Sequence, residues 1–202
     1  MPIHSYLLLS DQSGGSDIIL PVRSIMGTIP DLSWEKEFLY SIMADLVVGI
    51  SDLKCSNQPK DVIITYALGS CIAVVIYDPM VRVGGMLHFM LPDSTLDKIK
   101  AASAPAMFAD TGVPLLFKSC YQLGAEKKRL IVKIAGGASI LNDADYFRIG
   151  QKNITAMRKI FWKNNVLINA EDTGKNCNRT VKLQLADGKC FVRSSGGSVE
   201  EL

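Results

Sequence analysis

The stretch from Cys71 to Tyr77 is the feature that most constrains how this chain can fold. It reads Cys-Ile-Ala-Val-Val-Ile-Tyr, so apolar residues occupy both odd and even positions and several are β-branched. A run of this length and composition predicts a strand that is buried on both faces. Asp78-Pro79 ends it with a turn signal. Other elements must therefore cover both sides of this strand.

A second strand is predicted directly after the first. Gly84-Gly85 precedes the apolar run Met86–Leu91, which Pro92 ends. Two apolar runs joined by a short loop favour an antiparallel hairpin. Further β-prone runs occur at residues 62–65, 130–135, 166–168, 181–186 and 189–192. Asp187-Gly188 lies between the last two runs and favours a second hairpin.

Helical patterns interrupt these strands. One helix is predicted from a cap at Thr111 to a stop at Gly124, and another begins at Asn153 with apolar residues at helical spacing after it. The small and polar residues 93–105 predict a loop. Because helices and strands do not alternate regularly, the pattern favours an α+β fold with a mixed sheet.

Length and local composition predict the domain organisation. The chain has 202 residues, which at about 150 residues per domain indicates one domain, alone or with an appendage. Residues 1–45 carry no pattern that points to chemistry, and we expect an N-terminal extension or docking appendage there. Residues 46–193 are expected to form the domain that carries function. The polar residues 194–202 predict a flexible tail.

The charge balance limits the kinds of partner. Lys and Arg number 22 against 20 Asp and Glu, a net charge of +2. This is too small to favour nucleic acid or an anionic membrane as the main partner. No apolar run approaches the roughly 18 residues of a membrane-spanning helix, and the first residues lack the basic segment of a secretory signal. We therefore expect a cytoplasmic protein without membrane insertion.

The cysteines favour the same compartment. The chain contains five, at positions 55, 71, 120, 177 and 190, and none forms a C-x-x-C pair. An odd number without such pairs argues against a disulfide framework and against a cysteine zinc site. Free thiols of this kind suit a reducing cytosol. The sequence predicts no metal and no cofactor.

Thr65, Cys71 and His88 form the most promising chemical constellation. Cys71 follows a Gly69-Ser70 turn, where backbone N–H groups can face an incoming carbonyl and stabilise an oxyanion. If the hairpin pairs its two strands, His88 lies near Cys71, where it can activate the thiol and lower its pKa. The second ring nitrogen needs an orienting partner, which Thr65 can supply. The three residues would then follow the logic of a hydrolytic triad.

A purely structural interpretation of these residues stays open. A free cysteine is among the most buried residue types and often only fills space. A single histidine on an apolar strand is likewise often a packed and hydrogen-bonded core residue. The Gly136-Gly137 pair has a similar alternative, since it either lines the site with backbone or only makes a tight exit from a strand.

Several motifs in order resemble one known family. Residues 65–71 read T-Y-A-L-G-S-C and residues 84–92 read G-G-M-L-H-F-M-L-P. They resemble the motifs of the chemoreceptor glutamine deamidase family, CheD, which has a Thr, then L-G-S-C, then G-G-M-x-H-x-x-L-P. Residues 133–138, K-I-A-G-G-A, and 149–153, I-G-Q-K-N, resemble the family's K-x-x-G-G-A and I-G-x-R-N, with Lys152 replacing Arg. The resemblance covers about residues 47–193, and the stretch 172–180 departs from the family's usual Gly-rich pattern.

The resemblance implies an activity and roles for individual residues. The family hydrolyses side-chain amides of glutamines on chemotaxis receptors to glutamate and ammonia, and some members also hydrolyse receptor methyl esters. By motif, Cys71 is the nucleophile, His88 the general base and acid, and Thr65 the residue that orients His88. Attack would give an oxyanion held by backbone N–H groups from Gly69 to Cys71, and its collapse a thioester. Gly136, Gly137 and Asn153 would belong to the loops around the substrate.

The resemblance also implies a fold and partners. The family has a layered α/β/β sandwich with mixed sheets, similar to cysteine hydrolases and deamidating toxins. The expected partners are the cytoplasmic helices of chemotaxis receptors. An alternative function follows from the family's pairing with a CheC-type phosphatase of phosphorylated CheY, in which this protein would act as a regulatory binding module.

Overall fold

The computed structural model describes residues 6–9, 18–21, 45–139, 148–197 and 199–202. The chain divides into two units, Met1–Met43 and Ala44–Leu202. In the first unit, β1 (Tyr6–Leu9) pairs with β2 (Ile18–Pro21) in an antiparallel ladder. Most of the predicted appendage 1–45 lies outside the described residues, and its docking role stays a prediction.

The second unit contains two five-stranded mixed sheets. The first sheet has the order β12 (Val199–Glu201), β11 (Cys190–Ser194), β10 (Arg179–Gln184), β5 (Val62–Leu68) and β3 (Asp45–Val47). The second has the order β4 (Asp52–Ser56), β7 (Val83–Phe89), β6 (Ile72–Asp78), β8 (Ile131–Gly136) and β9 (Ala170–Thr173). The pairs β3–β5 and β8–β9 are parallel, and the other pairs are antiparallel.

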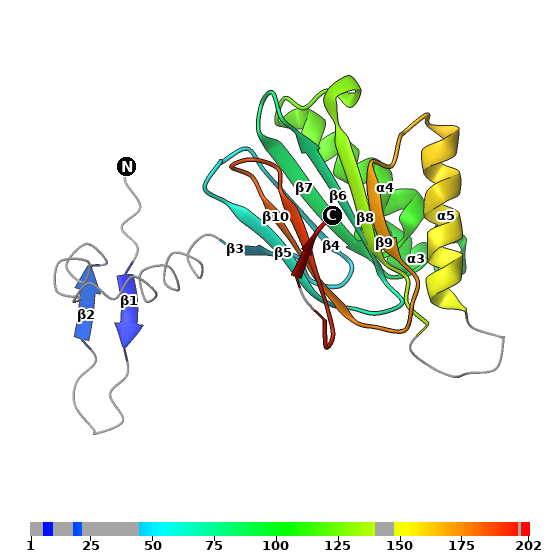
Figure 1. The fold of residues 1–202 in the computed structure, drawn as a ribbon, viewed down its shortest axis with the longest axis horizontal. Helices are drawn as coiled ribbons and strands as arrows, with labels where there is room; N and C mark the ends of the chain where they lie inside the picture. Colours follow the sequence, from blue (N-terminus) through cyan, green and yellow to red (C-terminus); the bar gives the residue numbers. More distant parts are fainter. Residues whose placement is uncertain (1–5, 10–17, 22–44, 140–147, 198) are drawn as a thin grey trace. The chain divides into compact units, whose positions relative to one another are not determined.

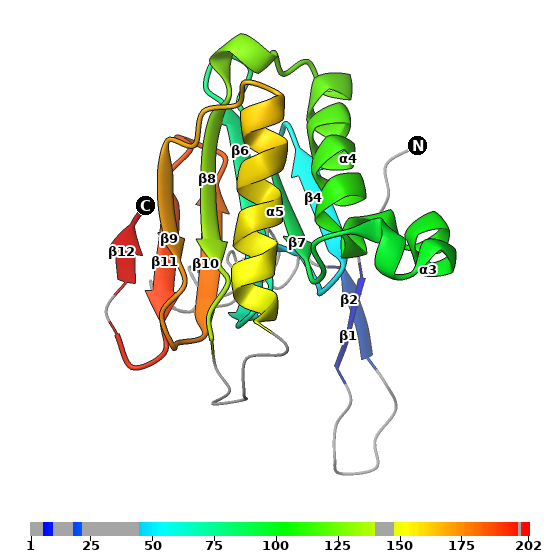
Figure 2. The same ribbon diagram turned by 90° about the vertical axis from the view of Figure 1, so that its right-hand side faces the viewer.

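Helices form a third layer. α3 (Lys98–Ser103), α4 (Ala109–Gln122) and α5 (Ile149–Lys163) lie on the face of the second sheet that points away from the first sheet (Figures 1 and 2). This arrangement confirms the predicted α+β fold with its α/β/β layers. Among the described residues, no helix is long and apolar enough to cross a membrane.

Strand β6 is the centre of the unit, as its sequence predicts. All of its residues are buried. Ile72, Val74 and Ile76 pack into the core beneath the helices, whereas Ala73, Val75 and Tyr77 pack into the core between the sheets. The alternating side chains of this strand therefore pack into two separate hydrophobic cores.

Some sequence-based boundaries are wrong. The strand predicted at 166–168 does not form, because these residues only lead out of α5, and β9 begins at Ala170. Leu167 is 75% exposed, so the apolar run there is not a core strand. The loop predicted at 93–105 contains α3, since the Asp97 carboxylate accepts a hydrogen bond from Lys100 N and caps it. Helix α5 begins at Ile149, one turn before the predicted start.

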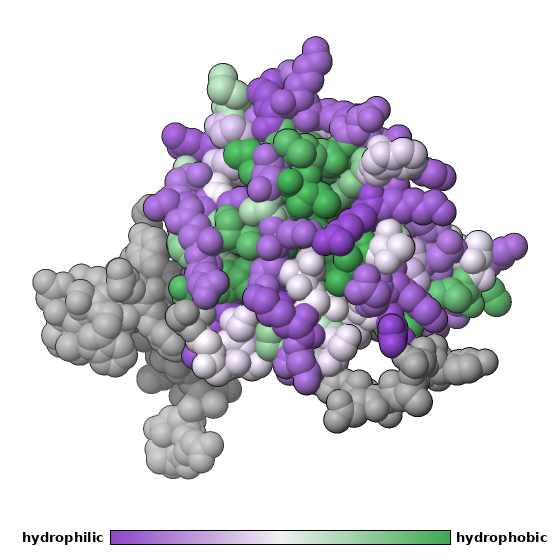
Figure 3. All heavy atoms as spheres, turned by 45° about the vertical axis from the view of Figure 1, so that its right-hand side comes forward, coloured by the Kyte–Doolittle hydropathy of each residue, from purple (hydrophilic) through white to green (hydrophobic). Residues whose placement is uncertain are grey.

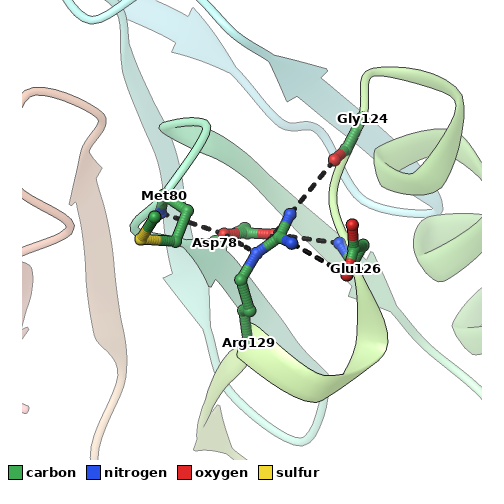
Figure 4. Close-up of polar contacts among 5 residues, drawn as sticks. All are labelled: Asp78, Met80, Gly124, Glu126 and Arg129. Atoms are coloured by element: carbon green, nitrogen blue, oxygen red, sulfur yellow. Dashed lines mark hydrogen bonds and ion pairs between the residues drawn. The ribbon is translucent and has the colours of Figure 1, made fainter.

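A buried carboxylate fixes the far end of β6 (Figure 4). The side chain of Asp78 is fully buried and accepts bonds from Arg129 Nε at 3.0 Å, from Glu126 N at 2.9 Å and from Met80 N at 3.0 Å. Burial alone would raise the pKa of Asp78, but these donors outweigh it and hold the pKa below its usual value. This end of β6 is anchored, while the other end leads from the Gly69-Ser70 turn.

Candidate active site

Thr65 and His88 meet between the two sheets. Thr65 lies in β5 of the first sheet and His88 in β7 of the second. The Thr65 hydroxyl lies 2.8 Å from His88 Nδ1 and donates to the Val48 carbonyl at 2.7 Å. Because a hydroxyl carries one proton, Nδ1 must donate to Thr65 Oγ1. This assigns the ring proton to Nδ1 and leaves Nε2 as an acceptor.

A β-bulge follows Thr65 in β5. Thr65 pairs with Val181 and Leu68 with Arg179, so β5 carries one more residue than β10 between these two pairs. The extra length falls at Tyr66-Ala67, both exposed, and Ala67 has a φ of 53°. Bulges commonly re-aim side chains beside active sites. Here the bulge lets both Thr65 and Leu68 face the core between the sheets.

The environment of His88 keeps its ring neutral. The residue is 1% exposed, and within the described residues its Nε2 is buried without a hydrogen-bond partner. Burial lowers the pKa of His88 to about 4. At neutral pH the ring is therefore an uncharged base whose free nitrogen is Nε2.

Cys71 lies on the same sheet face as His88. His88 pairs with Ala73 across β6 and β7, and Cys71 is two residues before Ala73, so the strand alternation places Cys71 diagonally from His88. Cys71 is half-buried and packs against the core between the sheets.

The charge state of Cys71 differs from the sequence-based expectation. Burial raises the pKa of the Cys71 thiol, and a backbone hydrogen bond offsets this only in part. The expected lowering by His88 is wrong, because an uncharged imidazole cannot stabilise a thiolate. The structure therefore holds a thiol and a neutral base rather than a preformed ion pair.

The turn before β6 is held by its carbonyl groups. Gly69 O accepts from Ala138 N at 2.9 Å, Ser70 O from Asn153 Nδ2 at 3.0 Å, and Cys71 O from Gly137 N at 2.8 Å. In a planar trans peptide the N–H points opposite to the preceding carbonyl. The Ser70 N–H therefore points away from Ala138, and the Cys71 N–H points away from Asn153.

Gly136 and Gly137 allow a close approach to this turn. They have φ angles of 115° and 70°, which favour glycine. A Cβ on Gly136 would overlap the Cys71 carbonyl oxygen, and one on Gly137 would lie 2.7 Å from Ile154. The pair is therefore a steric requirement for the segment that runs directly against Cys71.

Asn153 joins three elements. It is fully buried within α5, and its Nδ2 donates to Ser70 O at 3.0 Å and to Met90 O at 2.9 Å. Ser70 precedes Cys71, and Met90 follows the strand that carries His88. One amide therefore ties the turn of the cysteine to the strand of the histidine.

A buried ion pair supports this region and was missed from the sequence. Arg179 in β10 is 1% exposed and donates to both carboxylate oxygens of Asp172 in β9, at 2.8 and 3.0 Å. Hydrogen bonds from Arg179, and more weakly from Lys175, outweigh burial and lower the pKa of Asp172 to about 2. Gly174 N in turn donates to Gly136 O at 2.9 Å. The only sequence signal was the departure from the family pattern at 172–180.

A cavity of about 260 Å³ lies between α4 and α5, with Phe117 and Phe161 among its lining residues. Figure 3 shows hydrophobic side chains surrounded by hydrophilic ones on the side of the molecule that carries these helices. Neither Cys71 nor His88 lines this cavity.

Comparisons with known proteins identify the family of this chain. A family model described as CheD chemotactic sensory transduction matches residues 90–194. The chain is 68% identical over 160 residues to "Probable chemoreceptor glutamine deamidase CheD 1" of Syntrophus aciditrophicus (strain SB), covering 79% of this chain and 100% of that protein. It is 48% identical over 152 residues to "Probable chemoreceptor glutamine deamidase CheD 2" of Anaeromyxobacter dehalogenans (strain 2CP-C), covering 75% and 96%. It is 44% identical over 158 residues to "Probable chemoreceptor glutamine deamidase CheD" of Solibacter usitatus (strain Ellin6076), covering 78% and 94%.

Proposed function

Since this chain belongs to the CheD family, we propose that it is a chemoreceptor glutamine deamidase, which hydrolyses the side-chain amide of receptor glutamines to glutamate and ammonia. The printed names of its relatives support this activity. The observation that carries the proposal is the Thr65–His88 hydrogen bond, which leaves a neutral Nε2 on the sheet face shared by Cys71.

The first half of the reaction uses Cys71 and His88. His88 Nε2 takes the proton of the Cys71 thiol as the sulfur attacks the amide carbon of the glutamine. The carbonyl oxygen becomes an oxyanion, which we assign to the backbone N–H groups of Ser70 and Cys71. The His88 imidazolium then gives its proton to the amide nitrogen. The carbon–nitrogen bond breaks, ammonia leaves, and a thioester on Cys71 remains.

The second half regenerates the thiol. His88 is neutral again and removes a proton from a water molecule as its oxygen attacks the thioester carbon. The carbon–sulfur bond breaks, glutamate is released, and the proton on His88 returns to the sulfur. A receptor glutamyl methyl ester would follow the same path with methanol in place of ammonia, so the site also suits methylesterase activity.

Thr65, Gly136, Gly137 and Asn153 act in this proposal by positioning. Thr65 holds the Nδ1 proton of His88 and so keeps Nε2 free for the thiol. The two glycines allow segment 136–138 to run close to the turn, where its N–H groups donate to Cys71 O and Gly69 O. Asn153 is buried and fixes the turn from behind, so we assign it to positioning rather than to direct contact with substrate.

The partners of this reaction are receptor cytoplasmic helices, and we place the protein in the cytoplasm with them. A half-buried thiol at the start of a strand can be reached by a glutamine side chain that projects from a helix surface. The alternative is a regulatory role, in which the protein binds a CheC-type phosphatase and its own catalytic activity is not required. A Cys71→Ala variant that still binds and stimulates such a phosphatase would separate that role from catalysis.

The proposed activity is tested by mass spectrometry of a purified receptor cytoplasmic fragment. We expect wild-type protein to convert glutamine to glutamate, a Cys71→Ala variant to give no conversion, and a Cys190→Ala control to keep full activity. Cys190 is a suitable control because it is fully buried in β11, outside the turn. Equal conversion by wild type and Cys71→Ala would exclude Cys71 as the nucleophile.

A further inference from the structure

Two cysteines outside the proposed active site meet in the core beneath the helices. Cys120 in α4 donates its thiol hydrogen to the sulfur of Cys55 in β4, and the two sulfur atoms lie 3.3 Å apart. Both belong to the core between the second sheet and the helices, whereas Cys71 packs toward the first sheet. The pair is therefore separate from the residues that carry the proposed reaction.

A glycine makes the space in which the two sulfurs meet. Cys55 pairs with Gly85 across β4 and β7. A Cβ at Gly85 would lie 2.6 Å from the Cys120 sulfur and 2.8 Å from the Cys55 sulfur. Any other residue at position 85 would force the sulfurs apart. The local packing thus brings two thiols from distant parts of the chain into direct contact.

The two thiols are not equivalent. Cys55 is partly exposed, whereas Cys120 is completely buried. The hydrogen bond from Cys120 lowers the pKa of Cys55. The pKa of Cys120 is raised, because ionisation would remove the hydrogen that it donates to Cys55 and because its thiol is buried. Cys55 is accordingly the thiol that an external reagent meets first, and Cys120 is placed behind it to react second.

We propose that Cys55 and Cys120 form a dithiol site at which a low-molecular-weight disulfide, such as oxidised glutathione, is reduced and an intramolecular protein disulfide is formed. Cys55 loses its proton and attacks one glutathione sulfur, which gives a mixed disulfide and releases one glutathione. Cys120 then loses its proton and attacks the Cys55 sulfur, which releases the second glutathione. Two electrons pass from the protein thiols to the small disulfide, and two molecules of reduced glutathione result.

Formation of the bond requires only a local movement. The sulfur atoms must approach from 3.3 Å to about 2.05 Å. The product would join β4 to α4 and close a long loop that includes β5, β6 and β7. Closing a long loop restricts the unfolded chain, so the oxidised protein should resist unfolding more strongly than the reduced one.

The test uses the full chain incubated with oxidised glutathione and then treated with N-ethylmaleimide. We expect peptide mass spectrometry to find Cys55 linked to Cys120, about 2 Da lighter than the two thiol peptides together. Urea unfolding should shift to a midpoint roughly 1 M higher and return on reduction with dithiothreitol. Neither readout depends on deamidase activity, so the result stands or falls separately from the proposed function.

Matched variants identify the order of attack. Cys120→Ala should stop at a stable glutathione adduct on Cys55, Cys55→Ala should leave Cys120 unmodified, and Cys190→Ala should form the bond as the wild type does. Wild-type protein that keeps both thiols free, that accumulates the adduct on Cys55 without transfer, or that links Cys55 to another cysteine would overturn the proposal. The same would follow if linkage required urea.

Discussion

At the scale of single residues, the chemistry depends on which groups are charged. His88 donates from Nδ1 to Thr65 and keeps Nε2 free, and burial keeps the ring neutral near pH 7. The Cys71 thiol is neutral as well. Both groups are therefore uncharged at rest, and within the described residues no hydrogen bond joins His88 Nε2 to the thiol. This differs from cysteine sites that store a thiolate beside an imidazolium.

The neutral state of Cys71 can be measured by alkylation with iodoacetamide. We expect its rate in the folded protein to stay low near pH 7 and to rise at a higher pH than the rate of the same thiol in the unfolded chain, since burial raises the pKa of the Cys71 thiol. The measurement is peptide mass spectrometry after timed quenching at several pH values. A rate that is already at its plateau below pH 7 would instead indicate a preformed thiolate.

Burial of His88 also predicts a loss of stability on mild acidification. The folded-state pKa of about 4 lies below the unfolded value of about 6.5, so below pH 6.5 the unfolded chain binds a proton that the folded protein does not. Unfolding free energy should fall by about 2 kcal/mol between pH 6.5 and pH 5. A His88→Gln variant should lack this slope in urea unfolding experiments. An equal slope in both proteins would mean that His88 titrates normally when folded.

At the scale of elements, the turn at 69–71 is built by segments far apart in sequence. Ala138 and Gly137 follow β8, and Asn153 lies within α5, yet each donates to a carbonyl of this turn. The Ser70 N–H thereby points away from Ala138 and the Cys71 N–H away from Asn153. The orientation of these peptide groups is accordingly set by segments outside the turn.

The positioning role of Asn153 can be separated from a structural one. Asn153→Ala leaves two buried carbonyls without their donor, so we expect a loss of about 2–4 kcal/mol in stability and at least a tenfold loss in kcat with little change in KM. Met157→Ala is a matched control, because Met157 is a fully buried residue one turn further along α5 that serves only the core. It should lose similar stability and keep its kcat. Equal losses of kcat in both variants would show that Asn153 contributes to packing and has no separate positioning role.

The sequence predicted elements best where hydrophobic pattern decides them. The strand from Cys71 was predictable because both of its parities are apolar, and the hairpin with the strand of His88 was predictable because a short loop joins two apolar runs. Gly84 and Gly85 were expected to precede the second strand but lie within β7. Val166–Ile168 looked like a strand for the same reason but only leads out of α5, since pattern alone does not show which apolar run finds a sheet partner. The contact of Thr65 with His88 was suggested by motif, whereas the bulge after Thr65 arises from pairing with β10, which the hydrophobic pattern does not show.

At the scale of the whole molecule, the site lies where the two sheets meet. The first sheet contributes Thr65 and the second His88, so their hydrogen bond forms only when the sheets are packed together. Arg179 in the first sheet and Asp172 in the second join the sheets by a buried ion pair. Neither partner was identified from the sequence, because residues seven positions apart give no sign that they end in different sheets.

We propose that Cys71 forms a thioester with the receptor glutamine, and hydroxylamine would trap this intermediate. A receptor cytoplasmic fragment would be treated with the protein in the presence of hydroxylamine, and the glutamine-containing peptides examined by mass spectrometry. We predict a glutamyl hydroxamate at the sites that otherwise become glutamate, absent with Cys71→Ala. Continued formation of glutamate without any hydroxamate would contradict the thioester and indicate direct attack by water.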